Sequence, residues 1–191
     1  MTVRAFGAIV AARLFAQRQA IVYLCAACEL VGFLAPSGIE GPVFFGSLIG
    51  IAGALLQGPG RQPHLDLCEQ SAPLFGRELA RAKASVPCIL AALGTAAYFA
   101  GTLAHGLSPD IAYRFAVTLA AVIPSTLVAL SATIRTESAR LLYVAMACTA
   151  SLALYVAAVT FGVYVELAVA LPIAFLALRQ YGEALARYDP I

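Results

Sequence analysis

The sequence predicts an all-α membrane protein, a polytopic helical bundle of six transmembrane helices. An N-terminal interfacial helix and a cytoplasmic helical elbow between spans two and three complete it. Three observations support this fold class. The 191 residues are 62% hydrophobic and only 12% charged, about half the charged share of soluble domains. Several apolar runs are long enough to cross a bilayer. Nearly all basic residues fall on one side of the six-span arrangement, as retention of positive charge in the cytoplasm requires.

The basic residues define the orientation, because only Arg114 is left for the outer side. The others flank spans on the inner side: Arg4, Arg13, Arg18, Arg61, Arg77, Arg81, Lys83, Arg135, Arg140, Arg179 and Arg187. Residues 1–191 are therefore expected to form a single multi-pass domain of the inner cell membrane, with both termini in the cytoplasm. A net charge of +2 is too small to indicate nucleic acid, and anionic lipid is the expected partner of the basic ends.

The interfacial helix is predicted over residues 1–18. Arg13 and Gln17 share one face of this helix by their spacing of four, and the segment suits the cytoplasmic membrane surface. Spans one and two are predicted within residues 20–57, at about Ala20–Pro36 and Pro42–Gln57. A turn at Pro36-Ser37-Gly38 divides them.

Residues 61–84 form the long polar segment of the chain and predict the elbow. A short helix over His64–Gln70, a break at Ser71-Ala72-Pro73 and a second helix running into span three account for its pattern. Such an elbow can lie on the membrane or dock into a partner. The apolar residues available for docking are Leu65, Leu67, Leu74 and Phe75, while Arg77, Glu78, Arg81 and Lys83 suit a solvated face.

The lengths of the remaining apolar runs predict spans three to six. Residues 85–134 hold spans three and four, divided by a turn at Leu107–Asp110. Residues 141–178 form a run that would measure about 57 Å as one helix, far more than a bilayer core of ~30 Å. The run must reverse, and Thr160-Phe161-Gly162 is the predicted turn between spans five and six. Residues 179–191 form a cytoplasmic tail.

Three charged residues fall inside predicted spans and are the candidates for a substrate path or polar gate. Glu29 lies near the middle of span one, where an ionisable group costs about 2.5–3.5 kcal/mol on insertion scales. It must face protein or water, or be protonated. Arg114 and Glu166 lie at matching depths from the outer side, so an ion pair between them is predicted, with Asp110 as the competing partner of Arg114. The pair either fixes helix register or forms a gate.

No catalytic, metal or cofactor site is expected. The chain has no G-x-x-x-x-G-K-[ST], H-E-x-x-H or G-x-S-x-G motif, so it lacks the usual phosphate loop, zinc helix and nucleophile elbow. His64 and His105 are placed near opposite membrane faces and cannot share a metal. Cys25 and Cys28 share a helix face, which leaves a membrane thiol–disulfide oxidoreductase as one hypothesis; as small apolar packing residues they need no function.

Three stretches of the chain resemble the membrane subunit of type-2 ABC exporters. The first is Asp66-Leu-Cys-Glu-Gln-Ser-Ala-Pro-Leu-Phe-Gly-Arg-Glu-Leu-Ala-Arg-Ala-Lys83, which is similar to that family's cytoplasmic elbow. The others are Ala129-Leu-Ser-Ala-Thr-Ile-Arg135, similar to the exit of the fourth span, and Ala177-Leu-Arg-Gln-Tyr181, similar to the exit of the last. The chain departs from the family in having almost no outer insertion between spans five and six.

The resemblance implies that the elbow is a coupling helix seated in a groove of a separate ATPase subunit. Two copies of the membrane subunit and two ATPases would form the complex, and ATP-driven closure would move the elbows and open a path between the copies. The ATPase must be a partner, because the chain has no phosphate-binding loop. The alternative is a non-catalytic structural subunit of a respiratory, photosynthetic or secretion complex.

Overall fold

The fold was taken from a computed structural model that describes residues 2–34, 40–58, 64–66, 77–106 and 110–187. In these ranges the chain is helical and contains no strand. The long helices are α1 (Thr2–Ala16), α2 (Arg18–Leu34), α3 (Glu40–Leu55), α5 (Arg77–Thr102), α6 (Ile111–Ala132), α7 (Glu137–Phe161) and α8 (Val163–Arg187), and the short 3₁₀ helix η1 covers Leu103–His105. The predicted all-α class is therefore confirmed for the described part of the chain.

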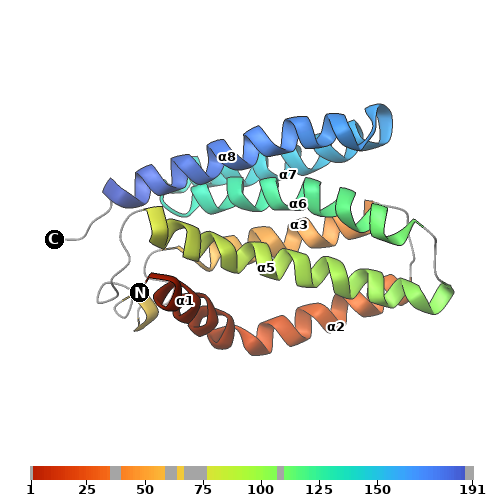
Figure 1. Ribbon diagram of the computed structural model, residues 1–191, viewed down its shortest axis with the longest axis horizontal. Coiled ribbons are helices and arrows are strands. Elements are labelled where there is room, and N and C mark those ends of the chain that lie inside the picture. The colour runs from red at the N-terminus through yellow and green to blue at the C-terminus, as the bar shows by residue number, and fades with distance from the viewer. Residues whose placement is uncertain (1, 35–39, 59–63, 67–76, 107–109, 188–191) are drawn as a thin grey trace.

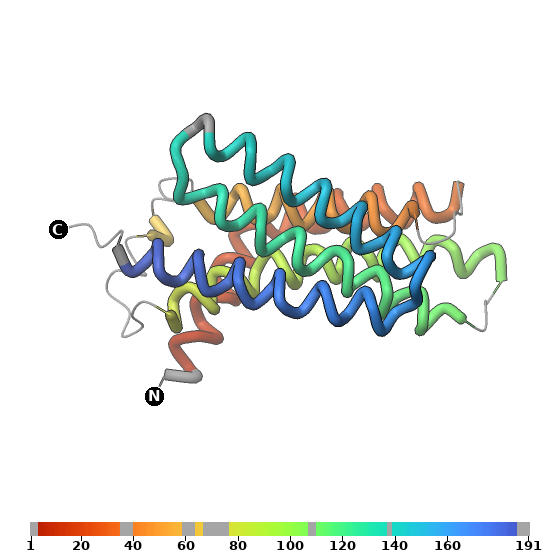
Figure 2. Tube along the Cα trace, turned by 90° about the horizontal axis from the view of Figure 1, so that it is seen from above, coloured from red at the N-terminus to blue at the C-terminus, as the bar shows by residue number. Residues whose placement is uncertain are grey.

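Six of these helices run side by side as a bundle, and α1 bends away at one end (Figures 1 and 2). α2 packs on α5 at one edge, α3, α5 and α6 form the middle, and the α7–α8 hairpin packs on α6 at the other edge. α6 is largely enclosed, whereas α7 and α8 expose rows of large apolar side chains. The start of α1 and the end of α8 lie at the same end of the bundle (Figure 1).

The length and the apolar character of each helix decide whether it could cross a membrane. α5 with η1, α6, α7 and α8 are long and apolar enough, and the α1–α2 pair adds a fifth candidate if its 68° bend is counted within one span. α3 is apolar but has 16 residues, about 24 Å of helix, which is shorter than the hydrocarbon core. The structure thus shows four to five candidate spans, and the six-span arrangement stays a prediction.

Several predicted breaks, at Pro36-Ser37-Gly38, Ser71-Ala72-Pro73 and residues 107–109, and residues 67–70 of the short elbow helix lie outside the described residues. The second helix of the elbow and span three form one helix, α5, as predicted. Chain reversal between α7 and α8 occurs at Gly162, whose φ of 89° is a backbone conformation that favours glycine. The tail predicted from residue 179 begins as helix, because α8 continues to Arg187. The interfacial helix ends at Ala16, and the chain bends at Gln17.

Small residues on α3 set its distance from its neighbours. A side chain on Gly50 would meet the Thr126 hydroxyl of α6 and Ala91 of α5, and one on Gly53 would meet Leu90 and Pro87 of α5. The glycines therefore serve close packing inside the chain. A second close approach joins α2 to α5, where Gly32 lies against the backbone of Tyr98 and Gly101 against that of Glu29.

Replacing Gly50 by leucine should destabilise the bundle, because a larger side chain must displace α3 from α5 and α6. We expect Gly50→Leu to lower the free energy of unfolding by about 1–3 kcal/mol, measured by thermal unfolding of the detergent-purified protein. Gly7→Leu is the matched control, since a side chain there meets nothing within 4 Å. Equal losses for the two variants would contradict the packing role of Gly50.

Candidate functional site

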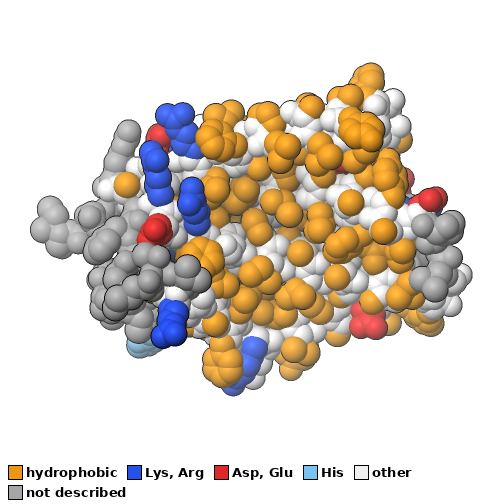
Figure 3. Space-filling view, in the orientation of Figure 1, with side chains coloured by type: hydrophobic (Ala, Val, Ile, Leu, Met, Phe, Trp, Pro, Cys, Tyr) orange, Lys and Arg blue, Asp and Glu red, His pale blue; other side chains and the backbone are white. Residues whose placement is uncertain are grey.

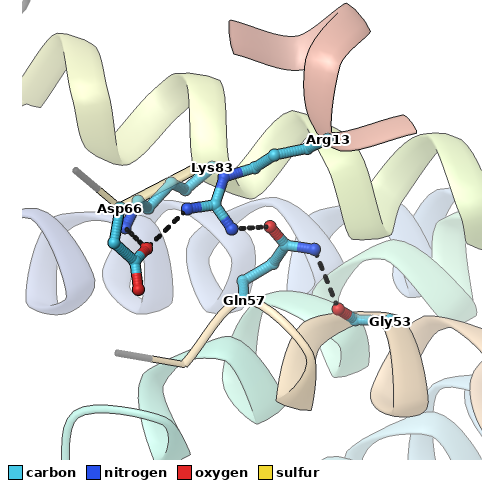
Figure 4. A network of polar contacts seen from close by, with 5 residues as sticks. All are labelled: Arg13, Gly53, Gln57, Asp66 and Lys83. Atoms are coloured by element: carbon cyan, nitrogen blue, oxygen red, sulfur yellow. Dashed lines mark hydrogen bonds and ion pairs between the residues drawn. The ribbon is translucent and has the colours of Figure 1, made fainter. Parts of the chain in front are cut away.

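A buried polar junction ties four segments of the chain together (Figure 4). We define this junction by its four side chains, which are Arg13, Gln57, Asp66 and Lys83. Arg13 lies near the end of α1, Gln57 directly follows α3, Asp66 lies in the short stretch 64–66, and Lys83 lies in the second turn of α5. The end of α3, residues 64–66 and the start of α5 therefore meet α1 here.

Arg13 is the centre of the polar junction. Its Nη1 donates to Oε1 of Gln57 at 2.9 Å, and its Nη2 donates to Oδ1 of Asp66 at 2.8 Å. The Nζ of Lys83 lies 3.5 Å from the same Asp66 oxygen, while Nε2 of Gln57 donates to the carbonyl of Gly53 at 3.3 Å. One guanidinium thus bridges an amide and a carboxylate that approach it from different segments.

Burial makes these contacts matter for stability. Arg13 is only 1% exposed and Gln57 is fully buried, so water does not compete for their hydrogen bonds. A guanidinium keeps its charge at any physiological pH, and its planar fork suits two partners at once. Removing one partner of a buried, charged network leaves the other charge uncompensated, which costs several kcal/mol. The junction therefore holds the elbow's Asp66 in one position relative to α1 and α5.

The polar face of α1 points inward, against the membrane-surface interpretation of the sequence. Arg13 and Gln17 are both buried, whereas the opposite side of α1 exposes apolar residues including Phe15. Ile9 on the inward side packs with Ala82 of α5. Arg13 on this inward side serves the junction, the buried side chain of Gln17 has no hydrogen-bond partner among the described residues, and apolar side chains such as Phe15 are exposed on the other side.

The coupling residues predicted from the sequence divide into three groups. Leu67, Leu74 and Phe75 lie outside the described residues. Leu65 is half-buried beside Asp66, and Arg77 and Glu78 are exposed in the first turn of α5, where a partner can reach them. Lys83 was expected on the solvated face, and this expectation is wrong. It is only 6% exposed, because the helical periodicity of α5 turns it toward Asp66.

The three intramembrane charges are not brought together. The predicted ion pair between Arg114 and Glu166 is absent, since both carboxylate oxygens of Glu166 are buried without a hydrogen-bond partner and no ion pair joins the two residues within the described chain. Glu166 is fully buried on the inward face of α8, whereas Arg114 is half-exposed on α6. Glu29 lies exposed on α2, on the perimeter of the chain.

No metal-binding cluster of His, Cys, Asp and Glu occurs among the described residues. Cys25 and Cys28 are free thiols one turn apart on α2, and Cys28 is buried against α5 and α3. His105 lies at the opposite end of the bundle from His64. Its Nε2 donates to the Phe33 carbonyl at 2.6 Å, so this ring joins η1 to the end of α2.

The charged surface is concentrated at the end of the bundle that holds the polar junction. Figure 3 shows basic side chains gathered there beside a broad apolar band. The basic cluster includes exposed Arg77, Arg81, Arg135 and Arg179. Arg179 also pairs with Glu183 at 2.7 Å along α8. This end thus combines positive charge with the start of the elbow.

No protein-family model matches the chain, and neither the curated proteins nor the solved structures contain a significantly similar sequence or fold. The function of the polar junction therefore has to be inferred from the geometry of its residues.

Sequence reasoning missed Gln57 and Asp66 as partners of Arg13. One signal was present in the sequence: a basic residue on an otherwise apolar helix needs a carboxylate or water, and Asp66 is an acid close to the membrane in the elbow. Sequence separation hid the contact, because Arg13 and Asp66 are 53 positions apart.

Arg13→Ala should destabilise the junction, because Asp66 and Gln57 lose their shared donor. We expect the free energy of unfolding to fall by about 3–5 kcal/mol, measured by thermal unfolding in detergent. Arg4→Ala on the same helix is the control, since Arg4 is exposed, and surface substitutions usually change stability by less than about 0.5 kcal/mol. Indistinguishable melting of the two variants would show that Arg13 does not hold the junction.

Proposed function

We propose that this chain is the membrane-spanning permease subunit of an ATP-driven ABC-type exporter, coupled to a separate ATPase through residues 61–84. The observation that carries the proposal is the polar junction, which fixes the base of the elbow to three parts of the bundle. A coupling element needs such an attachment, because a loosely tethered loop would absorb displacement without transmitting it. The resemblance of Asp66–Lys83 to the coupling elbow of type-2 exporters supports the same function.

In this proposal the partner recognises the elbow and the exposed start of α5. Leu65, Leu67, Leu74 and Phe75 supply apolar contact, Arg77 and Glu78 supply polar contacts, and Lys83 acts indirectly by holding Asp66. A second copy of the chain, or a related membrane subunit, would complete the transport path. Glu29 on the exposed face of α2 is the intramembrane charge best placed to meet that second subunit, because a charge facing hydrocarbon is costly.

The proposed topology has six crossings with both termini in the cytoplasm. α2 and α3 are short for spans, and they cross if the bilayer thins locally or if flanking polar residues reach the interface. The basic end of the bundle then faces the cytoplasm, and η1 faces the outside. The chain supplies no catalytic group, and the hydrolytic step belongs to the ATPase.

Cysteine accessibility tests this orientation. In a cysteine-free background, Ala104→Cys in η1 and Arg135→Cys after α6 place thiols at exposed positions at opposite ends of the bundle. We expect a membrane-impermeant maleimide to label position 104 in intact cells, and position 135 only after permeabilisation. The reverse pattern would overturn both the topology and the cytoplasmic position of the elbow.

Phe75→Asp tests the coupling role itself. A charge in an apolar anchor typically costs about 2 kcal/mol or more of binding free energy, so co-purification of the ATPase with the tagged chain should fall roughly 30-fold. Quantitative mass spectrometry of the purified complex measures this loss, and Leu74→Asp should act likewise.

Phe75→Leu is the matched control, because it keeps the apolar character and should retain the ATPase. Membrane yield must be the same for all three variants. Co-purification of the unchanged protein with a large cofactor-bearing assembly instead of an ATPase would favour the structural-subunit alternative. Different alkylation of Cys25 and Cys28 with and without reductant would favour the thiol oxidoreductase.

A further inference from the structure

Glu166 is an acidic side chain that the bundle encloses completely. It lies in the first turn of α8 and is 0% exposed, and neither carboxylate oxygen has a hydrogen-bond partner. The other buried polar side chains of the same half of the bundle are mainly hydroxyls bonded within their own helices, such as Thr118 to the Arg114 carbonyl at 2.8 Å. Glu166 therefore differs from the polar side chains around it in two ways: it is an acid, and its oxygens make no hydrogen bond within the described part of the chain.

The inward row of α8 shows what surrounds this carboxyl. Glu166 shares its helix face with Ala170, Ala177 and Tyr181, all buried. Ala170 packs with Leu154 of α7, Ala121 of α6 and Val43 of α3. Because α7 and α8 reverse at Gly162, Glu166 lies one turn outward from this apolar cluster, at the level of buried Ala158. The row thus presents a carboxyl where apolar packing would be expected.

Charged and titratable groups on the neighbouring helices do not neutralise Glu166. Arg114 on α6 makes no ion pair with it, and Tyr155 on α7 donates its hydroxyl to Glu40 at 2.6 Å. α5 packs on the opposite half of α8, around Ala80 and Tyr181. The remaining titratable groups toward this end of α6 and α8 are Asp110, Tyr113 and Tyr164, of which Tyr113 and Tyr164 are exposed.

An ionised carboxylate cannot stay in such a place. Moving an unpaired charge from water into an apolar interior costs many kcal/mol, and the group takes up a proton instead. We propose that Glu166 is a proton-binding site whose protonated form holds the α7–α8 hairpin against α6. Proton release leaves a carboxylate that must reach water or Arg114, which lies about one turn further out on α6, so the hairpin has to separate from α6.

Binding of one proton converts the carboxylate of Glu166 into the neutral carboxyl, and its loss restores the carboxylate. No other reaction is needed. Acid conditions therefore favour packing of the α7–α8 hairpin against α6, and alkaline conditions favour its separation from α6. This inference rests on the packing of α6, α7 and α8, and it stands or falls independently of the exporter proposal and its ATPase.

Infrared difference spectroscopy of two Glu→Gln variants on the same helix tests the site. At neutral pH, Glu166→Gln should remove a protonated-carboxyl C=O band from the spectrum of the detergent-purified protein. Glu183→Gln is the matched control, since Glu183 is solvent-exposed and paired with Arg179, and it should remove only carboxylate bands. Loss of a carboxylate band, with no carboxyl band, on Glu166→Gln would overturn the proposal.

A second measurement covers the case in which Glu166→Gln fails to fold. In a Glu29→Gln chain that keeps Glu166, the protonated-carboxyl band should still be present at neutral pH, and should fall about tenfold per pH unit above its midpoint. Thermal stability should fall as the pH rises from about 4.3, where the unfolded chain begins to ionise Glu166, to the midpoint of the band, and should level off above that midpoint because both states are then ionised. Absence of the band at neutral pH would overturn the site.

Discussion

The contact between Arg13 and Asp66 is the constraint on which the basic end of the bundle depends. A guanidinium that is 1% exposed can be neither hydrated nor deprotonated, so the chain must bring it an acceptor. That requirement places Gln57, just after α3, and Asp66 beside Arg13 of α1. The opposite end is joined by weaker links, the His105–Phe33 and Tyr155–Glu40 hydrogen bonds.

The middle of the bundle is held by another kind of interaction. Glycines on α3 leave room for side chains of α5 and α6, such as those of Ala91 and Thr126. Hydroxyls such as those of Ser125 and Thr126 donate to the Val122 carbonyl of their own helix. This satisfies polar groups without water, which membrane interiors require. Ser47 and Ser151 form the direct hydroxyl contact between α3 and α7, at 2.6 Å. Glu166 differs from these hydroxyls because it is an acid whose two oxygens are both buried without a hydrogen-bond partner among the described residues, and the proposed bound proton accounts for this difference.

Helix existence and chain reversals could be predicted because they depend on local properties. Run length and the Thr160-Phe161-Gly162 segment were enough to place the reversal between α7 and α8, whereas the break predicted at Pro73 and Gly76 lies outside the described residues. The direction in which a side chain points could not be predicted. The sequence predicts matching depths for Arg114 and Glu166, but an ion pair also depends on the rotation of the two helices about their axes, and tertiary packing decides that rotation. The same limit applies to Lys83 and Arg13, whose burial depends on an aspartate far away in the sequence.

α5 gives the elbow a mechanical connection to the rest of the molecule. It is one unbroken helix from Arg77 to Thr102, and its first turns lie beside the polar junction while its last turn lies against the backbone of α2 at Gly101. A helix transmits displacement along its axis better than a loop, since its backbone hydrogen bonds resist local distortion. In the proposed coupling, a force on residues 61–84 either breaks the Arg13–Asp66 contact or moves α5 and, through the close contacts at Gly32 and Gly101, α2 with it. Because breaking a buried charged contact costs several kcal/mol, the proposal expects small displacements to move α5 and the exposed face of α2 that carries Glu29.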